Sequence, residues 1–160
     1  MRSSLSFDGF YAGAPLGVVR ARVMELGGTP LACRRAQTDS TVVDCRSRLP
    51  AHSRLPVLHV WLSAIGGQTG ILTLAGRFDS AGLTRWQLAL SGTYGNVPVT
   101  TQGSQRMMQW VRQGRMIRLT WRSDATGASV SLSLVDGHIL DSWGRRNENG
   151  TGVAGDSAAR

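Results

Sequence analysis

Two neighbouring segments near the end of the chain alternate strictly between apolar and polar residues. In residues 115–122, isoleucine, leucine and tryptophan take every second position, between arginine, threonine and methionine. In residues 128–135, every second residue is apolar and serines fill the positions between them. Because successive side chains of a strand point to opposite faces, both segments are predicted to be strands with one buried face. The turn-forming residues 124–127 predict an antiparallel hairpin.

Two earlier segments have helical spacing. Apolar residues recur every three or four positions in residues 14–26, and again in residues 80–94. Pro15 suits the first turn of the first helix, and Asp79 can cap the second. Each segment is followed by a glycine and, three residues later, by a proline, which is typical of a helix end.

Other segments complete the predicted sheet. Residues 57–65 are apolar on both faces, as in a central strand, and the glycine-rich turn 66–70 leads into a partner strand at 71–76. A short last strand is predicted at 138–143. From residue 144 onward no apolar periodicity is present, which predicts a disordered polar tail over 144–160.

This order predicts an α+β fold, an antiparallel sheet with two helices packed on one face. With 160 residues, of which 41% are hydrophobic, the chain has the size and core of one domain, which we place at 14–143 after a lead-in segment, 1–13. The shared glycine and proline endings leave open a tandem helix-plus-strands repeat, 14–76 and 80–143. The alternative is that glycine and proline end both helices independently.

The two cysteines predict a disulfide. Cys33 and Cys45 are equidistant from Asp39, at the tip of a predicted hairpin, so they should face each other across its strands. The alternative is a pair of buried, reduced thiols. A disulfide favours an exported, periplasmic location, yet the chain as written has no export signal and no membrane-spanning stretch. Export therefore requires a true start further upstream; otherwise a cytoplasmic location is expected.

No catalytic, metal or cofactor motif is present. His52, His59 and His138 form no spaced pair, and strand alternation would put His138 and Asp141 on opposite faces. The glycine-rich turn 66–70 lacks the lysine of a phosphate-binding loop. The sequence therefore predicts a protein that is not an enzyme and that binds no cofactor or metal.

Charge marks a candidate binding face. All 18 basic residues are arginine, and the formal net charge is +8. Arginines on the predicted strand near residue 118 could bind phosphates, meet an acidic protein surface or lipid head groups, or only discourage edge aggregation. The predicted binding face consists of Arg112, Arg115, Met116, Arg118, Thr120 and Arg122.

Short motifs around the two helices carry a family resemblance. They comprise Gly13, Leu16, Gly17, Leu26, Gly27 and Pro30, repeated loosely by Leu83, Tyr94, Gly95 and Pro98. In them the chain resembles small bacterial envelope domains, namely outer-membrane assembly lipoproteins of the small protein A type and the β-lactamase inhibitory protein. The resemblance implies a non-catalytic domain that presents a sheet face to another protein. The chain departs from the lipoprotein pattern because it lacks a signal peptide and a lipid-attachment cysteine.

Together these features predict a bacterial envelope module that binds another envelope protein or an anionic surface. One alternative is a cytoplasmic nucleic-acid-binding domain that uses the arginine-rich strand face, with reduced cysteines and salt-sensitive affinity. A second alternative is a small hydrolase or ligand-binding enzyme, which would need a pocket with converging titratable groups.

Overall fold

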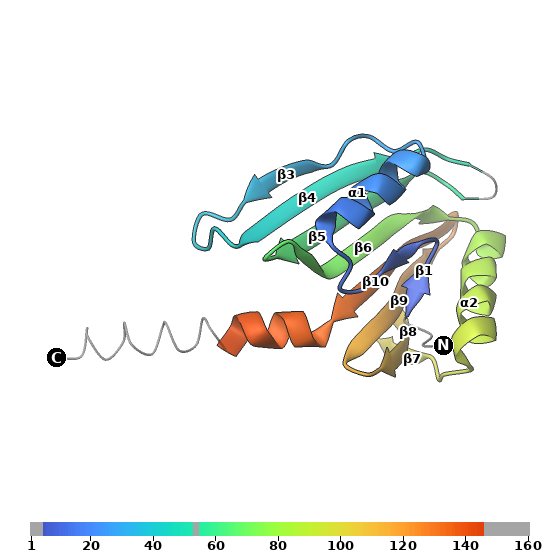
Figure 1. The fold of residues 1–160 in the computed structure, drawn as a ribbon. Coiled ribbons are helices and arrows are strands. Elements are labelled where there is room, and N and C mark those ends of the chain that lie inside the picture. Colours follow the sequence, from blue (N-terminus) through green and yellow to red (C-terminus); the bar gives the residue numbers. More distant parts are fainter. Residues whose placement is uncertain (1–4, 53–54, 146–160) are drawn as a thin grey trace.

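The computed structural model describes residues 5–52 and 55–145, and its centre is an eight-stranded antiparallel sheet (Figure 1). The strand order is β3-β4-β5-β6-β10-β9-β8-β7, and β1 and β2 form a separate two-stranded sheet. The predicted α+β class with an antiparallel sheet is confirmed. The elements are β1 (Ser6–Phe7), β2 (Phe10–Tyr11), α1 (Leu16–Glu25), β3 (Ala32–Arg35), β4 (Val42–Leu49), β5 (Leu58–Ile65), β6 (Gln68–Phe78), α2 (Ser80–Tyr94), β7 (Thr100–Gln102), β8 (Gln105–Arg112), β9 (Arg115–Asp124) and β10 (Gly127–Asp136).

The strands form two meanders joined at the centre of the sheet. Helix α1 is followed by β3 to β6, and α2 is followed by β7 to β10, with each strand paired to the next along the chain. The last strands of the two meanders, β6 and β10, pair antiparallel, so that Leu74 lies opposite Leu132. The β6–β10 pair is therefore the only strand pairing in the large sheet that joins the two meanders.

One face of the sheet, called the apolar face here, supplies the core. Both helices contribute to the same cluster, Val19 and Val23 from α1 and Trp86 from α2. The Trp86 ring packs edge-on against Phe78 of β6, with 4.5 Å between ring centroids. In the middle of β9 and along β10 every second side chain is buried on this face, so the predicted alternation of the two strands is confirmed. The large buried side chains of the apolar face include Leu49, Leu58, Val60, Leu62, Leu72, Leu74, Phe78, Met108, Trp110, Ile117, Leu119, Trp121, Val130, Leu132 and Leu134.

Helix α2 begins and ends where the sequence predicts. The Asp79 side chain accepts a hydrogen bond of 2.7 Å from the Gly82 backbone N–H, which satisfies one free donor of the first turn. Gly92 is exposed, and a Cβ there would meet no atom within 4 Å, so the residue serves no packing purpose.

The predicted disulfide is confirmed. Cys33 of β3 and Cys45 of β4 are directly paired in the strand register, and their Cα atoms are 4.1 Å apart. The disulfide therefore ties the edge strand β3 to its neighbour.

The last predicted strand, 138–143, is wrong, because residues 137–145 form a helix. The Asp136 carboxylate accepts a hydrogen bond of 3.1 Å from the Ile139 backbone N–H, which caps the helix at its start. Ile139 and Leu140 then lie against Gly70 near the start of β6, where an added Cβ would come within 2.9 Å of a Leu140 methyl group. Of the predicted tail, residues 144 and 145 belong to this helix, and the rest lies outside the described residues.

Candidate functional site: the polar face of the sheet

The second face of the sheet, called the polar face here, consists of the residues that alternate with the buried ones. These side chains are exposed or half-buried. Strand pairing places them in rows that cross the sheet. From β8 toward β4 the rows are Val111, Met116, Val135, Ile71, Ser63 and Asp44; then Gln109, Arg118, Ser133, Thr73, Trp61 and Arg46; then Met107, Thr120, Ser131, Ala75, His59 and Arg48; and, over three strands only, Arg122, Ser129 and Arg77.

Side-chain size varies systematically across the polar face. The central strands β6 and β10 carry mainly serine, threonine and alanine, and the Thr73 and Ser133 hydroxyls share a hydrogen bond of 2.9 Å. Long side chains stand on the strands to either side, such as Trp61 on β5 and Arg118 on β9. The long side chains on β5 and β9 can therefore reach a bound partner, whereas the short side chains on β6 and β10 leave a shallow centre between them.

The polar face is strongly cationic. Its described residues include six arginines but only two aspartates, and arginine keeps its charge at any physiological pH. Among residues 5–52 and 55–145, Arg46, Arg48 and Arg122 have no side-chain hydrogen bond or ion pair, and neither does Arg34 of β3. The charged residues of the face are Arg34, Arg46, Arg48, Arg77, Arg118, Arg122, Asp44 and Asp124.

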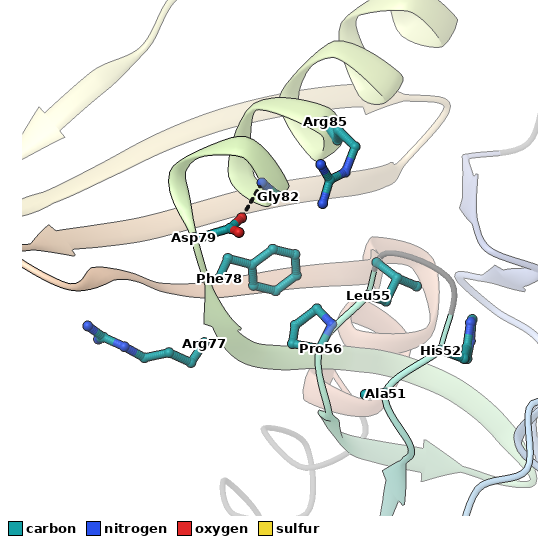
Figure 2. A pocket seen from close by; sticks show the side chains of 9 residues that line it. All are labelled: Ala51, His52, Leu55, Pro56, Arg77, Phe78, Asp79, Gly82 and Arg85. Carbon is teal, nitrogen blue, oxygen red and sulfur yellow. Dashed lines mark hydrogen bonds between the residues drawn. The ribbon is translucent and has the colours of Figure 1, made fainter.

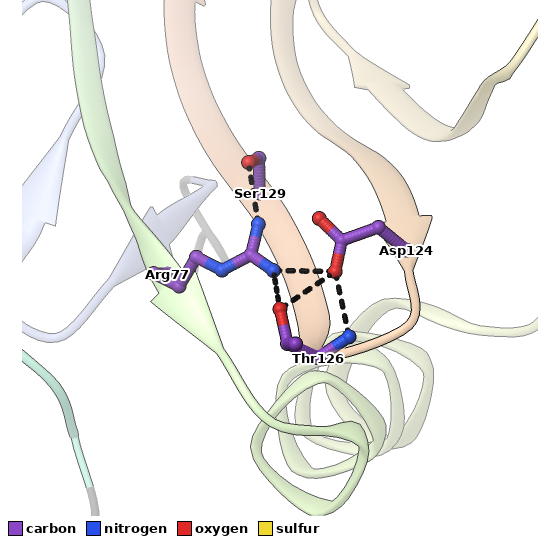
Figure 3. A network of polar contacts seen from close by, with 4 residues as sticks. All are labelled: Arg77, Asp124, Thr126 and Ser129. Carbon is purple, nitrogen blue, oxygen red and sulfur yellow. Dashed lines mark hydrogen bonds and ion pairs between the residues drawn. The ribbon is translucent and has the colours of Figure 1, made fainter.

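Arg77 differs from those four arginines because it belongs to a polar network (Figure 3). Its guanidinium donates to the Asp124 carboxylate and to the hydroxyls of Thr126 and Ser129. These bonds from Arg77, followed by those from Thr126, hold the pKa of Asp124 well below its usual range. The network fixes the β9–β10 turn against β6, so we assign Arg77 a structural role.

The predicted binding face divides between the two sides of the sheet. Met116, Arg118, Thr120 and Arg122 share the polar face of β9, as the alternation requires. The other two predicted residues, Arg112 and Arg115, lie on the opposite side of the sheet, next to residues of the apolar face.

Both of those arginines are engaged within the protein. The Arg112 guanidinium donates to the Tyr94 carbonyl at 3.0 Å and lies over the Tyr94 ring, while Arg115 pairs with Asp136 at 3.0 Å. They therefore hold α2 and the 137–145 helix in place instead of extending the polar face.

Residues of β4 and β5 that the sequence did not single out complete the polar face. Arg46 lies directly opposite Trp61, and Arg48 lies opposite His59. Alternation within β5 could have indicated His59 and Trp61, but tryptophan at an exposed position makes that strand look apolar on both faces.

Two recesses lie next to each other on this part of the polar face. One has a volume of about 320 Å³ and lies over β4, β5 and β6, and the other, of about 310 Å³, lies over β3 and β4. They share Asp44 and Arg46 in their linings. Two of the unpaired arginines, Arg34 and Arg46, therefore line these recesses.

A larger cavity, of about 450 Å³, lies where β6 leads into α2 (Figure 2). In Figure 2, Leu55 and Pro56 stand between His52 and Asp79, and Arg85 of α2 extends toward the cavity. The Asp79 carboxylate is bound to the Gly82 backbone N–H, so it is already engaged in capping α2. Arg77, at its margin, belongs to the network described above. We therefore place the candidate site on the polar face.

The described part of the chain has neither a cluster of metal-ligating side chains nor a membrane-spanning helix. No three histidine, cysteine or acidic residues there are grouped so as to hold a metal ion. None of the described helices is long and apolar enough to cross a membrane.

Comparison with known proteins finds no matching family model, and no significant match among curated proteins or solved structures.

Proposed function

We propose that this protein is a non-catalytic binding module whose polar face holds an acidic surface of another protein. The observation that carries the proposal is the charge of that face, six arginines against two aspartates. We infer that α1 and α2 both lie over the apolar face, since their buried residues join its core, and that the polar face is left free for a partner.

Charge complementarity makes an acidic partner the best match. Opposite charges speed diffusional encounter and suppress wrong partners, and the guanidinium fork binds carboxylates through two parallel hydrogen bonds. Arg46, Arg48 and Arg122 have no side-chain partner among the described residues, so they can bind without first breaking an internal ion pair.

A protein surface fits this pattern better than nucleic acid does. Nucleic-acid strands carry a phosphate at every nucleotide and favour an uninterrupted cationic path. Here Asp44 lies directly opposite Arg34, and the central strands offer hydroxyls rather than cations except at Arg77, which is already paired with Asp124. Carboxylates scattered over a protein surface can match arginines that are spaced in this way.

Binding to an acidic probe tests the proposal. We expect poly-glutamate, titrated at low salt into isotope-labelled protein, to shift the amide signals of β4, β5 and β9. Replacing Arg46 and Arg118 together by glutamate should weaken binding by at least about tenfold, because each change puts a like charge against the probe.

The matched control reverses Arg35 and Arg106, two exposed arginines that alternate with the polar-face residues of β3 and β8. An equal loss in this control would show that only net charge matters and would contradict the proposal. Tighter binding of a polythymidine oligonucleotide, or of phosphatidylglycerol vesicles, at the same strands would reassign the partner.

The Cys33–Cys45 disulfide supports an exported, periplasmic location, since disulfides persist in oxidising compartments. Protein isolated from its source, with free thiols trapped at lysis, is expected to contain none after denaturation. Peptide mapping should then recover the linked pair. Two trapped thiols would instead place the protein in a reducing compartment and contradict this part of the proposal.

The proposal also includes a tandem repeat of two helix-plus-strands halves. Its support is the topology, in which a helix is followed by a four-stranded meander twice and the two fourth strands pair at the centre. A repeat would explain why the polar face is continuous, because the same face of each half would remain free of helices.

A further inference from the structure

We infer that Arg46, Arg48, His59 and Trp61 form the anchoring subsite of the polar face. We propose that this subsite takes an aromatic side chain flanked by carboxylates on the partner's chain. The inference rests on the proposed function, because it names the part of the polar face that the partner would contact most closely and the chemistry it would recognise there.

Strand pairing fixes these four side chains in a two-by-two block. Arg46 and Arg48 are two residues apart on β4, and they lie opposite Trp61 and His59 of β5. The two rings are stacked, with 6.0 Å between centroids and 16° between planes. Two cations and two rings thus stand side by side on neighbouring strands.

Trp61 is much more exposed than the tryptophans that belong to the core. Its relative exposure is 45%, whereas Trp86, Trp110 and Trp121 are all buried. Tryptophan and arginine are the residues most often found at the energetic centres of protein interfaces. Exposed aromatic rings stack on other aromatic rings, and arginine binds carboxylates. The block can therefore bind an aromatic ring and a carboxylate of the partner at adjacent positions.

The recess of about 320 Å³ beside Trp61 has two kinds of wall. Trp61, Ile71 and Thr73 give it apolar surface, and Arg46 gives it a cation. Asp44 also lines it and accepts a hydrogen bond from the Ser63 hydroxyl at 2.5 Å. An aromatic side chain of the partner can lie against Trp61 and Ile71. The acidic residues next to it on the partner's chain then face Arg46 and Arg48 and point away from Asp44.

A nucleotide fits the same block less well. The row beyond Trp61 continues with Thr73 and Ser133, which provide no cation for the next phosphates of a strand. A peptide needs carboxylates only beside its ring. Cys45, whose neighbours in the sequence are Asp44 and Arg46, is bonded to Cys33. This disulfide holds β3 against β4 and so keeps the arginines of the block, which lie on β4, in one arrangement.

The test uses an acidic pentapeptide with a central phenylalanine, and its analogue with alanine at the centre. We expect Trp61→Leu and Arg46→Ala each to weaken binding of the phenylalanine peptide by about tenfold. Trp61→Leu should leave affinity for the alanine peptide unchanged, since that peptide has no ring to stack. The controls Arg106→Ala and Leu88→Ala remove an exposed arginine and an exposed apolar side chain elsewhere, and they should bind both peptides normally.

Each other outcome overturns a defined part of the inference. If Trp61→Leu binds the phenylalanine peptide normally while Arg118→Ala does not, the subsite is wrong but the proposed function stands. If no substitution on the polar face changes binding, both are wrong. If polythymidine binds at Trp61 more tightly than the peptide does, the chemistry assigned to the ligand is wrong.

Discussion

Replacing Arg115 by methionine is expected to lower the free energy of unfolding by about 3 kcal/mol, because it leaves a buried carboxylate without its ion-pair partner. The Asp136 side chain is only 4% exposed, and Arg115 pairs with it at 3.0 Å. The same carboxylate caps the 137–145 helix through Ile139, so it cannot move toward water without releasing that helix. Equilibrium urea unfolding of the variant and the unchanged protein measures the difference.

The matched control is Arg77→Met, which breaks the Arg–Asp pair with Asp124 at the surface. Both side chains of that pair are about half exposed, and exposed pairs contribute little because water screens them. The stability loss should therefore be much smaller than for Arg115. Equal losses in the two variants would show that burial of Asp136 does not determine the cost.

Reduction of the disulfide is expected to cost about 3 kcal/mol of stability, since cross-linking two residues restricts the unfolded chain. Cys33 and Cys45 are 12 residues apart and join an edge strand to the sheet. Thermal unfolding with and without dithiothreitol measures the effect. The Cys33→Ala, Cys45→Ala double variant serves as the control and should melt at the same temperature in both conditions. If reductant leaves the melting temperature of the unchanged protein unaltered, the expected contribution is absent.

Local sequence signals predicted the elements whose pattern is complete within a short segment. The β9–β10 hairpin followed from uninterrupted alternation, and α2 followed from helical spacing with Asp79 at its start. The disulfide followed from two cysteines placed symmetrically about one turn. In each case all the interacting residues lie close together along the chain, so no knowledge of distant pairing was needed.

Elements with mixed signals were either missed, as β8 was, or assigned the wrong structure. In β8, Met107 and Val111 are apolar although they lie on the polar face, so alternation is blurred. In the 137–145 helix, adjacent Ile139 and Leu140 suit a strand as well as a helix. The decisive feature is the cap that the Asp136 carboxylate provides at the start of the helix.

The candidate site depended on strand order more than on any motif. Arg118 and Trp61 lie in one row only because β6 pairs with β10, and the paired residues Thr73 and Ser133 are 60 positions apart in the chain. No local pattern reports such a pairing. The arginines of β9 could therefore be predicted as a face, whereas the Arg46–Trp61 half of it could not.

The pairing of β6 with β10 also has a consequence for biosynthesis. Residues 71–78 of β6 are made before α2, but their partners at 128–135 belong to β10, which is made after the other strands of this sheet. Until then β6 is an open edge, and open edges recruit strands from other chains. The first meander therefore exposes an unpaired edge strand until β10 is made, and we expect a chain that stops before β10 to aggregate more readily than the unchanged protein.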